Sequence, residues 1–324
     1  SGIGWIEPMP FSDITGFTGD REIYDQSVGA AGAGLVLLYG HRHGLSPKAL
    51  DWAVDCADRL LEVAEPTADG LRWLMMADMP FAFTAPNFAH GGAGVGYFLL
   101  EVYRATGDER YMEAAKSAAR YVQSRASTVG DGRLVCHTEE ARNPIFYLGA
   151  CHGPAGTGRL FLELYAVTGE AEWLDEARAL IRGMLALGAP EARSKGLWAN
   201  HSQCCGDAGV GEFALLMAER TGDEAYLSLA KRCADVIEAH SRLEGDRRSW
   251  IQAEHRDRPD GKATQEAEEQ FGFQKSQHGQ AFLSRYLRDR RPVGHCALPL
   301  SEHDRAGQQL STKNRSGATK CHRT

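Results

Sequence analysis

Cysteine and histidine residues stand directly before glycine-rich turns in this sequence. Cys151 and His152 precede one such turn, and the adjacent Cys204 and Cys205 precede the next. Cysteine and histidine are ligands that zinc prefers, and a catalytic zinc site keeps one coordination position open. A single pair of this kind is a weak sign of a metal, but two pairs before matching turns favour a zinc site.

The chemistry of such a site would be activation of a thiol. A zinc ion with thiolate ligands and an open position can bind a further thiol, lower its pKa and hold it as a nucleophile. Thiolate ligands also make zinc less Lewis-acidic, which suits thiol activation better than attack by water. His90 stands before a third turn and completes the set of candidate residues at these turns.

The turns belong to a repeat. Four segments share the pattern G-x-x-G-x-G followed by an apolar helical stripe, and their first glycines are spaced by 62, 62 and 53 residues: Gly29, Gly91, Gly153 and Gly206. A dinucleotide-binding loop follows a strand and occurs once, whereas no strand-like sequence precedes these turns. We interpret the glycines as small residues that let each helix start pack closely against its neighbours.

Each turn begins a predicted helical hairpin. In the second repeat an apolar stripe covers residues 95–103, the helix stops at 106–107, and a second helix covers about 111–122. Hairpins of this size cannot bury both faces alone and must stack on their neighbours. We therefore predict an all-α fold in which the hairpins form an α/α toroid, with the glycine turns lining one mouth.

Comparison of the repeats separates packing from chemistry. Cys56 and Cys233 occupy the same place in two second helices, which indicates core packing. By contrast, the position just before the first glycine holds Val28 in one repeat and His90 in the next. Packing that tolerates valine there does not require histidine or cysteine, so the polar residues at this mouth are the strongest functional signal in the sequence.

The composition excludes several classes of partner. The 324 residues carry a net charge of −7 with 43% hydrophobic and 24% charged residues, which argues against nucleic acid or an anionic membrane as the main partner. No apolar run is long enough for a membrane span, and the first residues carry no secretory signal, so we expect a cytoplasmic protein. In that compartment the eight cysteines are expected to be thiols rather than a disulfide framework.

The ordered series AHGGAG, CHGPAG and CCGDAG, together with the T-G-D/E helix stops, resembles the lanthionine synthetase C-like family over residues 25–259. SWIQAEHRDRP at 249–259 is also similar to the segment before that family's last repeat. The resemblance implies a zinc ion bound by Cys151, Cys204 and Cys205.

The resemblance also implies three residues that move protons. His90 matches the family's acid or base, Asp25 matches an aspartate four residues before a first glycine, and His152 stands where a proton donor is found. The family's cyclases add a cysteine thiol of a peptide to a dehydrated residue and form a thioether ring, as in lantibiotic biosynthesis. The implied substrate is a modified peptide, or a small thiol such as glutathione that adds to a dehydrated residue, with a dehydratase as a further partner.

Structural readings of several residues stay open. Asp25 could cap a helix, and His90 could be a hydrogen-bonded structural histidine. Glu254 and His255 could form an acid/base pair, although we expect a solvated or structural role. Other residues without a partner in the repeat are interpreted as ordinary surface or core residues: His41, His43, Cys136, His137 and His201.

The chain departs from the family's ring of seven hairpins. We assign residues 1–283 to a toroid domain with repeats starting near 25, 87, 149 and 202 and a degenerate one near 270. Two N-terminal hairpins are missing from this count, so we expect an incomplete ring. Residues 284–324 lack apolar periodicity and are expected to form an irregular or disordered tail, either a divergent end or the product of a frame change.

Two other functions remain as alternatives to thiol addition. A carbohydrate-active α/α-toroid enzyme would use the same hairpins with paired carboxylates, whereas this mouth carries thiols. A degenerate, non-catalytic zinc-binding scaffold would keep the metal without the reaction. Metal content separates the first alternative from a zinc enzyme, and activity separates the second.

Overall fold

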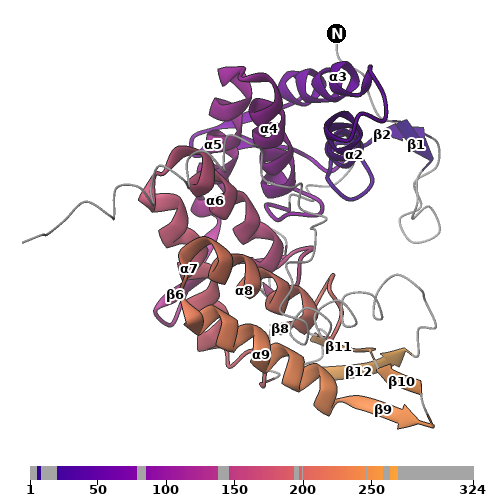
Figure 1. Cartoon of the computed structure of the whole chain (residues 1–324), viewed down its shortest axis with the longest axis vertical. Helices are drawn as coiled ribbons and strands as arrows, with labels where there is room; N and C mark the ends of the chain where they lie inside the picture. The colour runs from indigo at the N-terminus through magenta and orange to yellow at the C-terminus, as the bar shows by residue number, and fades with distance from the viewer. Residues whose placement is uncertain are drawn as a thin grey trace, which may run out of the picture.

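The computed structural model describes residues 6–8, 20–78, 85–137, 146–192, 197–198, 200–245, 247–250, 252–257 and 263–268. Within these residues, four helical hairpins follow one another along an arc (Figure 1). The first helices contact one another in sequence order: α2 (Ala30–Arg42), α4 (Gly92–Thr106), α6 (Pro154–Thr168) and α8 (Asp207–Thr221). The second helices lie on the outer side of the arc: α3 (Ala49–Glu62), α5 (Glu109–Ser124), α7 (Ala171–Ala186) and α9 (Glu224–Ala239). The predicted all-α hairpin architecture is confirmed.

The helix ends follow the predicted T-G-D/E stops. The helices α4, α6 and α8 end at Gly107, Gly169 and Gly222, whose φ angles of 74°, 71° and 71° lie in the left-handed region that glycine tolerates best. The side chains of Asp108 and Asp223 then accept a hydrogen bond from a backbone N–H in the first turn of α5 and α9. One short motif therefore ends a helix and starts the next.

The motif glycines are required by close packing, as the sequence predicted. A Cβ on Gly91 would lie 1.4 Å from the carbonyl oxygen of Ala85, in the segment that leads into the turn. A Cβ on Gly158 would lie 2.2 Å from the ring of Phe213 in the next hairpin. Such contacts are impossible for a side chain, so Gly91 lets its turn close on the preceding segment and Gly158 lets α6 approach α8.

Backbone hydrogen bonds join the turns in register. The N–H of Ser27 donates to the carbonyl of Ala89 at 3.0 Å, Ala89 donates to Cys151 at 2.8 Å, and Cys151 donates to Cys204 at 2.9 Å. Each of these residues stands two positions before the first glycine of its repeat. Equivalent positions of consecutive repeats therefore lie side by side at one end of the first helices.

Short β-hairpins follow three of the second helices, a feature that the sequence analysis did not predict. Their strands are β3 (Glu65–Thr67) with β4 (Gly70–Arg72), β5 (Ala126–Val129) with β6 (Gly132–Val135), and β9 (Ser241–Glu244) with β10 (Arg247–Trp250). Trp73 and Trp250 each donate an indole hydrogen bond of 2.7 Å to a helix carbonyl 13 residues earlier. The remaining pairs are β1 (Ile6–Pro8) with β2 (Asp20–Glu22), β7 (Phe146–Tyr147) with β8 (Leu197–Trp198), and β11 (Gln252–Asp257) with β12 (Ala263–Glu268).

The core runs continuously through the hairpins. Most residues of α4, α6 and α8 are buried, whereas α5 and α7 bury one face each. Cys56 and Cys233 are 1% and 0% exposed, which confirms their assignment to the core. No helix in the part of the chain that the structure describes has the length and apolar character needed to span a membrane.

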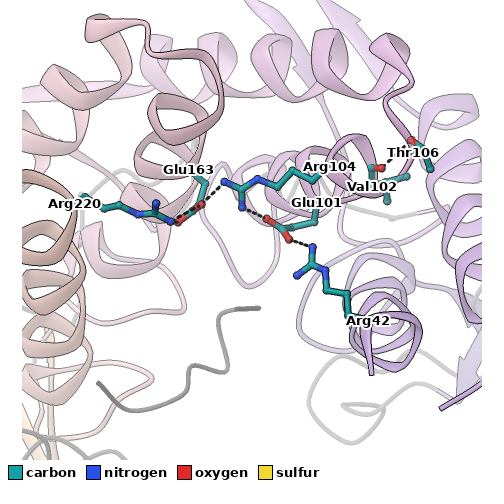
Figure 2. A network of polar contacts seen from close by, with 7 residues as sticks. All are labelled: Arg42, Glu101, Val102, Arg104, Thr106, Glu163 and Arg220. Carbon is teal, nitrogen blue, oxygen red and sulfur yellow. Dashed lines mark hydrogen bonds and ion pairs between the residues drawn. The ribbon is translucent and has the colours of Figure 1, made fainter. Parts of the chain in front are cut away.

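Ion pairs connect the first helices near their C-terminal ends, away from the glycine turns (Figure 2). Glu101 of α4 is 1% exposed and accepts from Arg42 of α2 at 2.6 Å and from Arg104 at 2.7 Å. Arg104 also donates to Glu163 of α6 at 2.7 Å, and Arg220 of α8 donates to the same carboxylate at 2.9 Å. This polar chain links all four hairpins.

The predicted domain limits stay predictions. The degenerate repeat near 270 and the tail 284–324 lie outside the described residues.

Candidate metal centre

Three cysteine sulfurs from two consecutive hairpins gather at the glycine-turn end. The Sγ atoms of Cys151 and Cys205 lie 3.4 Å apart, as do those of Cys204 and Cys205, and all three sulfurs lie within 4.8 Å of one another. Zinc–sulfur bonds of about 2.3 Å in a tetrahedron place the ligand sulfurs about 3.8 Å apart. The size of the cluster and its donor atoms therefore fit a zinc ion.

The backbone fixes the three cysteines before any metal is considered. The N–H of Cys151 donates to the carbonyl of Cys204, so the two turns are joined at the cluster itself. The N–H of Cys205 donates to Ser202 Oγ at 3.1 Å, and that hydroxyl donates to Asn200 Oδ1 at 2.7 Å. Sequence reasoning missed Asn200 and Ser202, both 2% exposed, because their role depends on the shape of the turn.

The electrostatics of the cluster also favour a cation. Hydrogen bonding to the Cys204 and Cys205 sulfurs, together with burial, raises the pKa of Cys151 far above that of a free thiol. Neighbouring thiolates repel one another in a partly buried site, so the sulfurs hold their protons when no cation is present. A divalent cation removes this penalty, because it neutralises the thiolates and displaces their protons.

Asp25 and His90 form a pair beside the cluster. His90 Nδ1 lies 2.7 Å from Asp25 Oδ2, and Asp25 is 1% exposed. The other carboxylate oxygen accepts from the N–H of Val28 at 2.8 Å, so Asp25 both caps the turn and holds the histidine. Since a carboxylate only accepts, Nδ1 carries the hydrogen, and Nε2 of neutral His90 is the nitrogen with a lone pair.

His152 follows Cys151 in the same turn and is buried beside His90. It is 5% exposed, and its ring centroid lies 5.2 Å from that of His90. Within the described residues its Nδ1 atom has no hydrogen-bond partner. Burial first, and then the charges that His137 and His90 can carry, lower the pKa of His152 well below the ordinary value. The ring is therefore neutral near pH 7.

His137 also lies in this group, although the sequence gave no reason to select it. Its ring centroid is 4.0 Å from that of His152 and 4.6 Å from that of Tyr147, on which it stacks. Burial and the nearby His90 lower the pKa of His137 to about 4. The interpretation of His137 as an ordinary residue therefore misses its place in the site.

The other residues without repeat partners lie outside this group of rings. His201 Nδ1 lies 2.8 Å from Asp207 Oδ2, and this buried pair stands just before and after the two adjacent cysteines. His43 is exposed and contacts Tyr39 at the end of α2. His41 is exposed and Cys136 is partly buried. Glu254 and His255 belong to β11, but their side chains are outside the described part of the chain.

Solved structures similar to this one include two glycoside hydrolase family 76 proteins. One comes from a bovine Bacteroides thetaiotaomicron strain, with 17% identity, a TM-score of 0.54, and 90% of this chain and 61% of that chain covered. The other, a mannosidase from Bacteroides thetaiotaomicron, has 16% identity, a TM-score of 0.52, and 81% and 70% coverage. Likeness at these identities shows the fold, which is the α/α toroid that the repeats predicted.

Nisin cyclase is a further structural neighbour, with 16% identity, a TM-score of 0.46, and 67% of this chain and 52% of that chain covered. The chain thus spans about half to seven tenths of the length of these three solved structures. The family model of lanthionine synthetase C-like proteins matches residues 7–246, which is most of the chain. This chain belongs to the lanthionine synthetase C-like family.

Proposed function

We propose that this protein adds a thiol to a dehydroamino acid and forms a thioether, with zinc held by Cys151, Cys204 and Cys205. The observation that supports this most is the cluster of three sulfurs within 4.8 Å. The His90–Asp25 pair and His152 lie beside it, so thiol ligands and acid/base groups converge at one place. Zinc bound there supplies a positive charge that lowers the pKa of a substrate thiol and holds its sulfur as a nucleophile.

His90 is proposed as the base. Its Nε2 atom takes the thiol proton, and Asp25 stabilises the resulting imidazolium through the 2.7 Å contact to Nδ1. Asp25 also fixes the ring orientation, because its second oxygen is held by the turn backbone. This arrangement gives His90 one defined tautomer at the moment of proton transfer.

After the sulfur adds to the β-carbon, the α-carbon requires a proton. The ring centroids of His90 and His152 lie 5.2 Å apart, so the proton taken from the thiol stays within reach of both imidazoles. Because burial lowers the pKa of His152, a proton that reaches this ring is readily given up. We propose His152 as the group that delivers it.

The proposed substrate is a peptide that carries both a cysteine and a dehydrated residue, or a small thiol that adds to such a residue. A dehydratase would then supply the unsaturated residue. The reaction needs reduced thiols, and we therefore place the protein in the cytoplasm.

The test uses the purified full chain in two measurements. Metal analysis of the wild type is expected to give about one zinc per chain, as a single site of three thiolates requires. Each of Cys151→Ala, Cys204→Ala and Cys205→Ala should lose the metal, whereas Cys56→Ala, in the remote helix α3, should keep it. A folded wild type without zinc contradicts the proposal.

The second measurement follows a peptide that carries dehydroalanine and cysteine. Cyclisation leaves the mass unchanged but removes the free thiol, so N-ethylmaleimide labelling with mass spectrometry reports the reaction. The zinc-loaded wild type should remove the thiol, and the three cysteine variants should not. Zinc binding without thioether formation would instead support a non-catalytic scaffold.

A further inference from the structure

Three imidazole rings and one phenol ring contact one another near the cysteine cluster. The ring of His137 stacks on Tyr147 with 23° between the planes and lies 4.0 Å from the ring of His152. The ring centroid of His152 also lies 5.3 Å from that of Tyr147 and 5.2 Å from that of His90. His152 is therefore the central ring of this group.

Ring contacts are the visible restraint on the plane of His152. Its Nδ1 atom is buried and has no hydrogen-bond partner within the part of the chain that the structure describes. His90 differs, because Asp25 fixes its plane directly. Aromatic contacts at these centroid distances orient rings, although each is weaker than a charged hydrogen bond.

The backbone of His137 is itself fixed by a buried side chain. Asn87 is 0% exposed and its amide nitrogen donates to the carbonyl of Cys136 at 2.7 Å and to that of His137 at 3.3 Å. Its amide oxygen accepts from Thr157 Oγ1 of α6 at 3.1 Å. The end of the β5–β6 hairpin is thus tied to the second and third repeats together.

Asn87 occupies the same position in its repeat as Asp25 does in the first repeat. Asn87 stands four residues before Gly91, and Asp25 stands four residues before Gly29. In the first repeat this position holds the side chain of His90, and in the second it holds the backbone of His137. The same place in two consecutive turns therefore holds two residues, His90 and His137, whose rings both contact His152.

We infer that His137 is a positioning residue for His152: its backbone is held by Asn87, its ring stacks on Tyr147, and this ring keeps the buried His152 ring in the plane needed for proton delivery. The inference rests on the proposed thiol addition for its catalytic consequence. Its structural content, that His137 restrains His152, does not depend on the reaction.

The structural content is tested by acylation of histidines with diethylpyrocarbonate, followed residue by residue with mass spectrometry on the zinc-loaded full chain. His152 should react slowly in the wild type, since it is 5% exposed. His137→Ala removes one ring contact and should raise the rate at His152 about fivefold or more. His137→Phe keeps a stacking ring and should restore the wild-type rate.

A matched control is His43→Ala, which removes an exposed histidine that contacts Tyr39 at 4.1 Å and should leave the rate at His152 unchanged. If His137→Ala does not fold, His137→Leu provides a variant of similar volume without a ring. An unchanged rate at His152 in the ring-free variant overturns the inference, and so does a His137→Phe rate as high as that of the ring-free variant.

The catalytic consequence is tested on the cyclisation assay. The ring-free variant should lower kcat with little change in KM and full zinc content, and His137→Phe should recover most of kcat. Equal kcat in the wild type and the ring-free variant overturns the positioning role in catalysis. If the wild type itself shows no thiol addition, the proposed function fails, while the acylation pattern still decides whether His137 restrains His152.

Discussion

The pair of Asp25 and His90 offers the most direct test of the proposed mechanism. Asp25→Asn keeps the size of the side chain and an oxygen that can accept from the N–H of Val28, as Asp25 Oδ1 does at 2.8 Å. It removes the negative charge that lies 2.7 Å from His90 Nδ1. The variant therefore changes the charge at the pair while it preserves the turn.

The size of the effect follows from the burial of the two groups. A proton on His90 interacts with a carboxylate that is 1% exposed, and two unit charges about 4 Å apart attract by about 4 kcal/mol at an effective dielectric constant of 20. His90 is 22% exposed, so solvent screens part of this energy and about 2–4 kcal/mol remains. Loss of that stabilisation in the transition state lowers kcat by about 30- to 1,000-fold.

The assay is cyclisation of the dehydroalanine peptide under saturating substrate, with kcat normalised to bound zinc. Asp207→Asn is the matched control, because Asp207 is buried and pairs with His201 at 2.8 Å in the same geometry. It should cost stability but leave kcat per zinc-loaded molecule near the wild-type value. If Asp25→Asn keeps kcat within about threefold of the wild type, the assignment of His90 as an Asp25-supported base is refuted.

Three further predictions concern the fold and the site. Glu101→Ala leaves Arg42 and Arg104 without their shared buried carboxylate and should lower the free energy of unfolding, measured by urea denaturation, by about 2–4 kcal/mol. The control Arg110→Ala breaks an exposed ion pair and should lower it by less than about 1 kcal/mol. Equal losses in the two variants would contradict a structural role for the ion pairs that connect the first helices. Gly158→Ala places a Cβ 2.2 Å from the Phe213 ring and should lower the free energy of unfolding by about 1–3 kcal/mol, with partial recovery in the double variant that adds Phe213→Leu. An unchanged free energy of unfolding in the single variant would show that the first helices can move apart freely. The pKa of His137 in the folded protein is about 4, below that of an unfolded histidine, so the stability that its neutral form contributes is complete above about pH 6.5 and is lost as the pH falls towards 4. His137→Phe should therefore reduce the slope of the unfolding free energy against pH in this window by up to about 1.4 kcal/mol per pH unit. An unchanged slope would contradict a buried, neutral His137.

Much of the architecture could be predicted from local patterns. The apolar stripes, the T-G-D/E stops and the repeated glycines predicted four helical hairpins, because helix periodicity and helix stops are set within a few residues of the chain. The stop at Gly107, for example, depends only on its own left-handed conformation. The β-hairpins after α3, α5 and α9 were missed, because their strands are three or four residues long and carry little alternation of apolar and polar residues.

The repeat also brought the sequence close to the candidate site. Positions two and one before the first glycine lie side by side in consecutive turns, so Cys151, Cys204 and Cys205 could be grouped once the repeats were aligned. His90 was selected by comparing the repeats, whereas Asp25 and the acid/base role of His90 depended on the family resemblance, since no local pattern relates a residue of one turn to a residue 65 positions later. Their 2.7 Å contact was visible only in the structure.

The sequence by itself determined the helical repeat, its glycine turns and the types of residue that could hold a metal there. Only the tertiary structure decided which imidazoles share the site, because His137 comes from the end of a β-hairpin and its backbone is held by Asn87, which stands 50 residues earlier in the same repeat. The physical reason is range: helix periodicity and capping act within a few residues, whereas the contact of His137 with His152 is set by the packing of separate hairpins.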